Sequence, residues 1–473
     1  MEKNRELVKN TVIITVGKIC TQFLSFFLLP LYTAVLSTNE YGTVDLLMTY
    51  QQLIGYIVFF QIEQAIFRFL IEVRNKDYEI SEIVSSCVLF ALFQSAVLGL
   101  GFKIFALFTG YHYTTYLFLY VVAAIFSGLM LQIARGVGKN QVYALGSFVS
   151  ALATIMFNIL FLVVFHYGVE GMLTSYILGN LLCALTVFII LHVHRYLQVS
   201  RFNFNSLKKC LKYSIPLVPN ALSWWIMSAS DRTIVAYMLG TSYNGLLTVA
   251  NKFSTAFTSF YTIFNLSWTE SASLHIVDED ASIFFKGVIH RVYKLFASAA
   301  IGIIAVMPFV FNIFVNKNYA DAYYQIPIYM LASLCQVFQG MYSVIYVALK
   351  KTKEIAKTTT ISALINIIVD FALINSVGLY AASVSTLVAY LFLCIWRYFD
   401  LKKYMDVRFD LKLLVSSVIL AVLVCITYYI RNTILSVGAL IFVIIYAVFL
   451  NKEIIVLIIK GPQNIKNLLT HKK

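Results

Sequence analysis

The chain has 473 residues, of which 60% are hydrophobic and only 12% are charged, and its formal net charge is +14. Soluble domains carry about 25% charged residues, so this composition excludes an ordinary water-soluble domain. The Lys and Arg residues lie almost entirely in short gaps between long apolar runs, as in the cytoplasmic loops of membrane proteins. We therefore expect an all-α polytopic membrane protein and no binding of nucleic acid.

Apolar runs long enough to cross a membrane follow one another along the chain. A helix needs about 20 apolar residues to cross about 30 Å of hydrocarbon. By this criterion about fourteen transmembrane helices are predicted, over residues 11–36, 43–70, 83–108, 114–135, 143–167, 170–194, 214–240, 244–272, 289–315, 325–349, 356–377, 380–401, 411–430 and 434–456. The first run is longer than the apolar core of a signal peptide and has no obvious small-residue cleavage site, so it is expected to stay as the first span.

The basic residues predict the orientation of these spans. With the amino terminus inside, the external loops hold only Lys317 and Arg431, and the other loop cations are cytoplasmic. The positive-inside rule then predicts a multi-pass protein of the bacterial cytoplasmic (inner) membrane with both termini in the cytoplasm. Only an even number of spans keeps this asymmetry, because one missed span inverts every later loop.

A basic stretch at residues 201–213 differs from the other loops. It carries Phe204, Leu207 and Leu211 at helical spacing, which predicts an amphipathic helix lying on the inner membrane face. Two prolines follow, and the chain then enters the seventh predicted span. This stretch is the predicted boundary between two halves of the protein.

A short internal repeat supports the division into halves. The sequence L-S-T-N-E-Y-G at residues 36–42 recurs in part as L-G-T-S-Y-N-G at 239–245, each time at an outer turn between paired spans. Six predicted spans separate the copies, so both run in the same direction, which is typical of transporters built from two bundles. The predicted organisation is an N-terminal six-helix lobe at 1–200, the interface helix and a second six-helix lobe at 201–403, and two additional helices with a basic tail at 404–473.

Few ionisable residues fall inside the predicted spans, where each charge needs a partner or a wet cavity. Asp231 and Arg232 precede Gly240 by nine and eight residues, and Lys252 follows Tyr243 by nine. At about 1.5 Å of rise per residue, these groups lie at equal depth on antiparallel neighbours. The spacing predicts an Asp231–Lys252 ion pair that leaves Arg232 to bind an anionic ligand. A purely structural ion-pair cluster is the alternative.

The first half contains three further candidates for the substrate cavity. The same depth arithmetic brings Lys18 and Glu63 within reach of each other near the inner third of the membrane. Alternatively, Lys18 extends its ammonium group to the cytoplasmic interface. Arg68 lies still closer to that interface, as a loop cation or as a contact for a diphosphate.

Asp370 is a candidate for ion coupling, since buried acids bind H+ or Na+ in many transporters. Asn366 lies one turn earlier on the same predicted helix, and Asn158 is the apparent repeat mate of Asp370 in the first half. Because an asparagine does not titrate, the alternative of a structural helix–helix hydrogen bond is favoured.

The tryptophans allow two interpretations. Trp224, Trp225 and Trp268 lie within predicted spans, where indole rings either stack on sugar rings or pack among helices and at the membrane interface. For Trp224 and Trp225 the packing interpretation is favoured.

Motifs for catalysis, nucleotide binding and metal binding are absent from the sequence. The seven cysteines show no C-x-x-C spacing, and there is no P-loop, G-x-S-x-G or H-E-x-x-H motif. We expect no catalytic residues, no metal site and no cofactor apart from a coupling ion, H+ or Na+. The prediction is a secondary transporter and not an enzyme.

Several short motifs carry a family resemblance. The run D-R-x7-G-x4-G-x6-K at residues 231–252 resembles the seventh and eighth spans of polysaccharide-biosynthesis flippases. The turn L-x5-G at 36–42, A-I-F-R-F at 65–69 and R-G-V-G-K at 135–139 resemble first-half features of the same family. These proteins form the polysaccharide transporter branch of the multidrug/oligosaccharidyl-lipid/polysaccharide exporter superfamily, and the resemblance covers essentially the whole chain.

The resemblance implies a fold and a function. Two six-helix lobes are expected to form a V around a central cavity, with two extra C-terminal helices. The expected substrate is a polyprenyl-diphosphate-linked oligosaccharide, which alternating access moves from the inner to the outer leaflet for O-antigen, capsule or exopolysaccharide biosynthesis. Membrane lipids are expected partners, and a polysaccharide polymerase and glycosyltransferases are candidate partners.

Three alternatives remain open at this point. A drug or cation antiporter of the same superfamily typically has twelve spans, whereas the peptidoglycan-precursor flippase also has fourteen. A membrane enzyme such as an oligosaccharide polymerase usually needs large external loops, and the longest external loop predicted here covers only residues 315–324.

Overall fold

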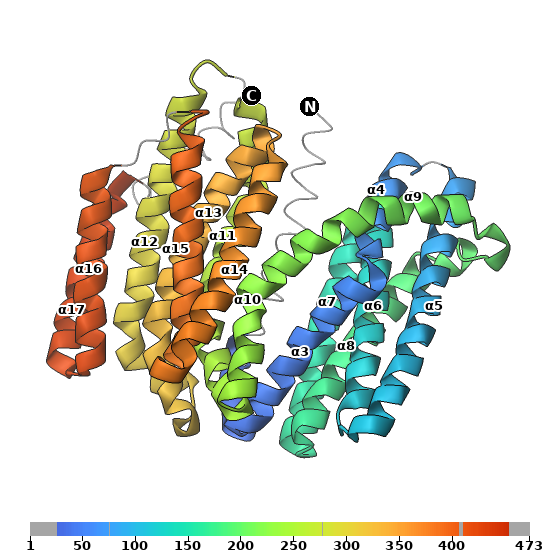
Figure 1. Cartoon of the computed structure of the whole chain (residues 1–473), viewed down its shortest axis with the longest axis horizontal. Coiled ribbons are helices and arrows are strands. Elements are labelled where there is room, and N and C mark those ends of the chain that lie inside the picture. Colours follow the sequence, from blue (N-terminus) through green and yellow to red (C-terminus); the bar gives the residue numbers. More distant parts are fainter. Residues whose placement is uncertain (1–25, 75, 277, 406–409, 454–473) are drawn as a thin grey trace, which may run out of the picture. The chain divides into compact units, whose positions relative to one another are not determined.

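A computed structural model of the chain describes residues 26–74, 76–276, 278–405 and 410–453. Within these residues the chain forms helices and no strand, so the all-α prediction is confirmed (Figure 1). Ten of the described helices are long and apolar enough to cross a membrane, and the bent pair α3 (Thr38–Phe59) and α4 (Ile62–Glu72) is a further candidate if it forms one broken span. The chain is therefore a multi-pass membrane protein.

Each predicted span from 43–70 onward is covered by a helix or a broken helix. Beyond α3 and α4 the helices are α5 (Asp77–Thr109), α6 (Thr114–Gly136), α7 (Asn140–Asn158) with its π-helical continuation η1 (Ile159–Val164), α8 (Gly168–Ile190), α9 (Phe204–Ser214), α10 (Val218–Met238), α11 (Thr241–His275), α12 (Ala281–Phe314), α13 (Ile326–Ala348), α14 (Thr352–Val377), α15 (Tyr380–Leu401), α16 (Leu411–Ile430) and α17 (Thr433–Leu450). Helices α10 and α11 are long enough but are not among the ten apolar candidates, because both are rich in Ser, Thr and Asn.

The first predicted span, 11–36, falls mostly outside the described residues, and α2 (Leu29–Val35) covers its end. The total of fourteen spans therefore stays a prediction. The turn between the last two spans is confirmed, since Asn432 caps α17 by accepting from the backbone N–H groups of Ile434 and Leu435.

The chain packs into two compact units. The first contains residues 1–252 and 370–382, and the second contains 253–369 and 383–473. In the first unit α6, α7 and α8 pack together and α4 lies against α6 and α9, while in the second α12 packs against α13, α16 and α17 (Figure 1). The unit boundaries fall inside α11, α14 and α15, and the predicted division at residues 200 and 403 stays a prediction.

The predicted amphipathic helix forms as α9, and the expected apolar face is covered in part. Asn203 caps α9, which packs against α4 and α5. Leu207 and Cys210 are buried, whereas Phe204 is 67% exposed. The sequence pattern located the helix correctly; the packing of α4 and α5 decides which apolar residues are covered.

A sharp break separates α3 from α4. Phe60 and Gln61 both adopt left-handed backbone conformations, with φ of 51° and 52°, and the two helices differ in direction by 58°. Bulky non-glycine residues rarely adopt this conformation, and such strain is often found at functional sites. The break directs Gln61 and the first turn of α4, with Glu63, toward α10.

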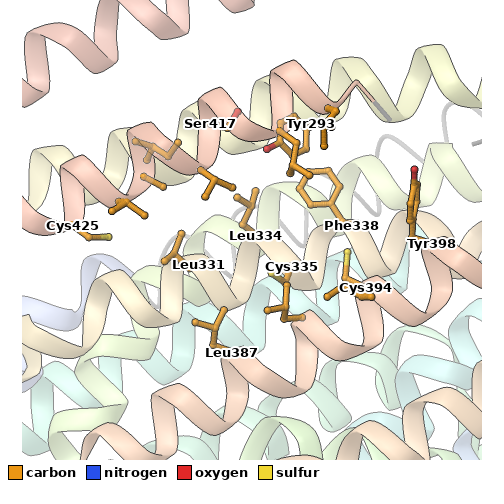
Figure 2. A pocket seen from close by; sticks show the side chains of 18 of the residues that line it. Tyr293, Leu331, Leu334, Cys335, Phe338, Leu387, Cys394, Tyr398, Ser417 and Cys425 are labelled. Atoms are coloured by element: carbon orange, nitrogen blue, oxygen red, sulfur yellow. The ribbon is translucent and has the colours of Figure 1, made fainter. Parts of the chain in front are cut away.

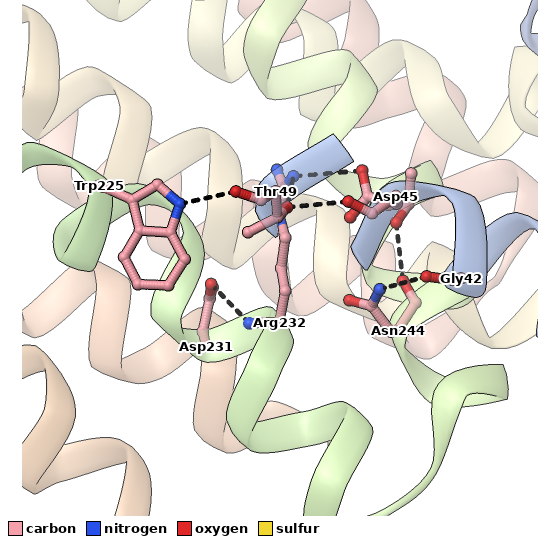
Figure 3. A network of polar contacts seen from close by, with 8 residues as sticks. Gly42, Asp45, Thr49, Trp225, Asp231, Arg232 and Asn244 are labelled. Atoms are coloured by element: carbon pink, nitrogen blue, oxygen red, sulfur yellow. Dashed lines mark hydrogen bonds and ion pairs between the residues drawn. The ribbon is translucent and has the colours of Figure 1, made fainter. Parts of the chain in front are cut away.

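The two copies of the internal repeat, at residues 36–42 and 239–245, contact each other in the first unit. Helix α3 and the start of α11 cross so closely that a Cβ on Gly42 would overlap the carbonyl oxygen of Thr241, and a Cβ on Gly245 would overlap that of Thr38. Asn244 Nδ2 donates to the Gly42 carbonyl at 2.8 Å (Figure 3). The two copies of the repeat thus contact each other reciprocally, with glycine required on both sides.

Alanine at either crossing glycine is expected to destabilise the protein, because overpacking a close contact costs about 1–3 kcal/mol. Thermal unfolding of the purified Gly42→Ala and Gly245→Ala variants measures the effect. Gly128→Ala is the matched control, since a Cβ there meets nothing within 4 Å. Unfolding temperatures of both crossing variants equal to that of Gly128→Ala would contradict the close crossing.

Candidate functional site

A polar cluster joins α3 to α10 in the first unit (Figure 3). Arg232 Nη1 lies 3.1 Å from Asp45 Oδ1 and 3.4 Å from Thr49 Oγ1. The side chains of Arg232 and Asp45 are only 22% and 12% exposed. Most of this ion pair is therefore withdrawn from water, where an unpaired charge would be costly.

The predicted Asp231–Lys252 ion pair is not formed. Within the described residues Lys252 has no carboxylate within 4.0 Å, and the charges that act on its ammonium group belong to Asp45 and Arg232. The sequence analysis did not consider Asp45, an acid three residues beyond Gly42 and inside the predicted span 43–70. Its carboxylate pairs with Arg232, and its charge acts on Lys252 from farther away.

Asp231 lies next to Arg232 on α10 (Figure 3). It is buried, and its Oδ1 accepts the backbone N–H of Arg232 at 2.9 Å. Asp370 lies in the same unit, is fully buried, and is acted on by the charge of Asp231. Neither carboxylate oxygen of Asp370 has a hydrogen-bond partner in the described part of the chain, so the structural hydrogen bond expected for Asp370 is not made.

The repeat mate of Asp370 behaves differently. Asn158 is fully buried and donates from Nδ2 to the hydroxyl of Tyr32 at 3.0 Å. This contact is structural, so the two positions of the repeat have different roles.

A polar pocket lies beside the α3–α4 break. It comprises two adjoining cavities of about 470 and 280 Å³, and Gln52, Tyr56 and Glu63 line both. Trp224 and Trp225 of α10 line the larger one. We call this the break pocket. The predicted pairing of Glu63 with Lys18 stays a prediction, because Lys18 lies outside the described residues.

Arg68 is not part of the break pocket. Its Nη1 pairs with Glu72 at 2.9 Å one turn along α4, and both side chains are about half exposed. Of the sequence candidates in the first half, the structure therefore places Glu63 in a cavity and Arg68 on the surface.

The second unit holds an apolar groove of about 1060 Å³ that the sequence did not predict (Figure 2). Its walls come from α12, α13, α15 and α16, with Leu331, Phe338, Leu387 and Cys425 among the lining residues. Each wall residue belongs to a predicted span, so only the packing of four helices reveals that they enclose a space.

The second unit also buries one arginine without a carboxylate partner among the described residues. Arg397 is 0% exposed, and its guanidinium donates to Gln339, Ser343, Thr358 and Thr359. Neutral acceptors on α13 and α14 surround the charge. Its partners are all part of the protein, so its role is structural.

The fold and the two sites define a multi-pass membrane protein with buried charge clusters, a polar pocket and an apolar groove, which are features of membrane transporters. The family model described as "Polysaccharide biosynthesis protein" matches residues 7–268. The chain belongs to this family, and the resemblance stated from its motifs is confirmed.

Solved structures show the same fold. The chain is similar to a structure entitled "Lipid II flippase MurJ, inward closed conformation", with a TM-score of 0.70 and 16% identity over 95% of this chain and 100% of that chain. It is also similar to an inward-facing multidrug resistance MATE family transporter of the MOP superfamily, with a TM-score of 0.65 and 13% identity over 82% of this chain and 98% of that one. A search of curated protein sequences found no match.

Exchanging the members of the Asp45–Arg232 pair tests the cluster. Asp45→Asn or Arg232→Gln leaves one charge unpaired, and breaking a buried pair costs about 3–5 kcal/mol, less where water reaches it. The double variant Asp45→Arg with Arg232→Asp is expected to recover part of the lost thermal stability. Arg68→Ala, which breaks an exposed pair, should cost at most about 1 kcal/mol. A double variant no more stable than the weaker single variant would refute the pairing.

Proposed function

We propose that the chain is a flippase that moves a polyprenyl-diphosphate-linked oligosaccharide from the inner to the outer leaflet of the cytoplasmic membrane by alternating access, for surface polysaccharide biosynthesis. Its family and its fold support a transporter. The observation that carries the proposed substrate is the pair of cations Arg232 and Lys252, of which Arg232 pairs with Asp45 and Lys252 lies within the influence of both charges.

The charges of this cluster suit a diphosphate. Arg232 and Lys252 supply two positive charges for an anion that enters from a cavity, while Asp45 and the adjacent buried Asp231 carry the balancing negative charges. A guanidinium stays charged at any accessible pH and holds two phosphate oxygens in one fork. The diphosphate would compete with Asp45 for Arg232, and Asp45 would hold Arg232 in place when no substrate is bound.

The apolar groove of the second unit suits the other end of such a substrate. A polyprenyl chain is a branched hydrocarbon, and each buried methylene is worth about 0.8 kcal/mol in transfer from water. The groove of about 1060 Å³ is lined almost wholly by apolar side chains and offers no polar competitor for the chain. Polar headgroup and apolar tail would thus bind to different parts of the protein.

The remaining predictions belong to this proposal: fourteen spans, two six-helix lobes around a central cavity, and an inner-membrane location with both termini in the cytoplasm. The cytoplasmic bias of Lys and Arg supports the orientation. A drug or cation antiporter and a peptidoglycan-precursor flippase are the competing functions. The match of the family model to polysaccharide biosynthesis proteins favours the oligosaccharide substrate.

We also propose that Asp370, with Asp231, binds the coupling ion. Two carboxylates that act on each other inside a protein cannot both stay ionised at low cost unless a cation or a proton is present. Both oxygens of Asp370 lack a hydrogen-bond partner among the described residues, which fits a carboxylate that binds Na+ or takes up H+.

Export of surface polysaccharide in a strain without its own flippase tests the role of Arg232. Arg232→Ala and Arg232→Gln should lower export about tenfold or more at normal membrane abundance, because the bidentate phosphate contact is lost. Arg232→Lys keeps the charge without the fork and should retain partial export. Arg291→Ala, which removes an exposed arginine, should leave export unchanged. Normal export by a well-expressed Arg232→Ala variant would refute the phosphate contact.

Ion dependence tests Asp370. Purified wild-type protein should gain thermal stability when NaCl replaces KCl if Na+ is the ion, or change stability with pH if H+ is the ion. Asp370→Asn should abolish this response, while Asp321→Asn, at an exposed position, should keep it. An Asp370→Asn variant that responds to both NaCl and pH like the wild type would exclude Asp370 as the ion ligand.

A further inference from the structure

We propose that the break pocket is a glycan subsite, which binds a neutral or amino sugar of the transported saccharide and rejects an acidic sugar. This inference rests on the proposed function and adds to it the chemical class of the sugar. The features that carry it are five carboxamides, two indole rings and a carboxylate with one buried oxygen that lacks a hydrogen-bond partner among the described residues, all within the first unit.

The carboxamides come from three neighbouring segments. Gln51 and Gln52 belong to α3, Gln61 and Gln64 to the break and α4, and Asn220 to α10, and each lines one of the two cavities. None of the five side chains makes a hydrogen bond within the described part of the chain. Each offers one acceptor and two donor hydrogens, so together they match a ligand whose surface consists of hydroxyl groups.

The five carboxamides converge on the break pocket, which indicates a common ligand. Polar side chains facing lipid are costly, and inside membrane helices they turn toward protein or a water-filled cavity. Here the left-handed residues Phe60 and Gln61 bend the chain so that α4 presents Gln64 and Glu63 to the same cavity as Gln52. The strained conformations of Phe60 and Gln61 thus bring together polar groups that have no partner among the described residues.

Two indole rings form an apolar wall of the pocket. Trp225 is held in place because its Nε1 donates to the carbonyl oxygen of Thr49 at 3.0 Å (Figure 3). Trp224 lines the same cavity, and Tyr56 lies among the carboxamides. Pyranose rings present apolar C–H faces and polar edges, and pockets that combine aromatic walls with a few placed polar groups bind such ligands. The proposal gives Trp224 the sugar-stacking role that the sequence left as the less favoured interpretation.

The pocket also lies next to the proposed phosphate contact. Trp225 bonds to Thr49, and the hydroxyl of Thr49 accepts from Arg232 at 3.4 Å. In a polyprenyl-diphosphate-linked saccharide the first sugar follows the diphosphate directly. A diphosphate at Arg232 would therefore place the first sugar beside the indole rings and the next one toward Glu63.

Glu63 determines which sugars are accepted. Its Oε2 is buried without a hydrogen-bond partner, and no described cation pairs with it. A carboxylate accepts strong hydrogen bonds from sugar hydroxyls or from an ammonium group. It repels the carboxylate of a uronic acid, because two like charges at close range are unfavourable.

Binding of short analogues to the purified protein in lipid nanodiscs tests the inference. The probes are farnesyl diphosphate alone and farnesyl diphosphate linked to disaccharides that end in glucose, galactose, glucosamine or glucuronic acid. Wild-type protein should bind at least one neutral or amino-sugar conjugate about tenfold more tightly than the glucuronic acid conjugate and than farnesyl diphosphate, since a site built for hydroxyls discriminates against a ligand that leaves it unpaired.

Variants separate the subsite from the phosphate contact. Trp224→Ala and Gln52→Ala should weaken binding of the preferred conjugate about tenfold and leave farnesyl diphosphate unchanged, whereas Trp396→Ala in the second unit should change neither. Glu63→Gln should raise the relative affinity for the glucuronic acid conjugate. Arg232→Ala should weaken every probe, and thermal unfolding of each variant checks that it is folded.

Each outcome decides a different point. Loss of binding in Arg232→Ala with unchanged sugar preference in Trp224→Ala and Glu63→Gln would overturn the subsite and keep the proposed function. Sugar preference lost in Trp224→Ala, with full binding by Arg232→Ala, would keep the subsite and overturn the phosphate contact. An unchanged ratio of acidic to neutral binding in Glu63→Gln would show that another group, such as Lys18, neutralises Glu63, and would overturn the rejection of acidic sugars.

Discussion

The cost of placing charged and polar groups in hydrocarbon governs most of the structure. An ionised side chain at the centre of a bilayer costs roughly 2.5–3.5 kcal/mol on insertion scales, so each such group must be neutralised, surrounded by acceptors or exposed to a cavity. This protein uses all three arrangements. Asp45 neutralises part of the charge of Arg232, neutral acceptors surround Arg397, and the carboxamides beside Glu63 line a pocket.

The same constraint separates groups that stabilise the fold from groups suited to function. Arg397 has its hydrogen-bonding capacity met by α13 and α14 and has no need of a ligand. Asp370 and Glu63 instead bury carboxylate oxygens without partners among the described residues. A buried acceptor that the protein leaves unsatisfied is expensive, and an ion, a proton or a sugar hydroxyl offsets that cost in the proposals made for these two residues.

Backbone geometry positions the site as much as side-chain chemistry does. The reciprocal crossing at Gly42 and Gly245 brings α3 against the start of α11, and this contact brings Asp45 near Lys252. The left-handed residues at the end of α3 then turn the chain into α4 and set Glu63 beside Trp224. One close contact and one break thus arrange the charged cluster and the polar pocket along a single helix.

The sequence by itself determined the fold class, the helical segments from 43–70 onward and the family, because hydropathy is a local property of the chain. It did not determine which side chains at equal depth meet, since this depends on the rotation of each helix about its axis and on its neighbours. The expected Asp231–Lys252 pair failed for that reason, and Asp45 was overlooked. Tertiary packing alone decides three further features: the apolar groove, the buried acceptors around Arg397 and the carboxamides beside the α3–α4 break. Each of them is assembled from helices far apart in sequence.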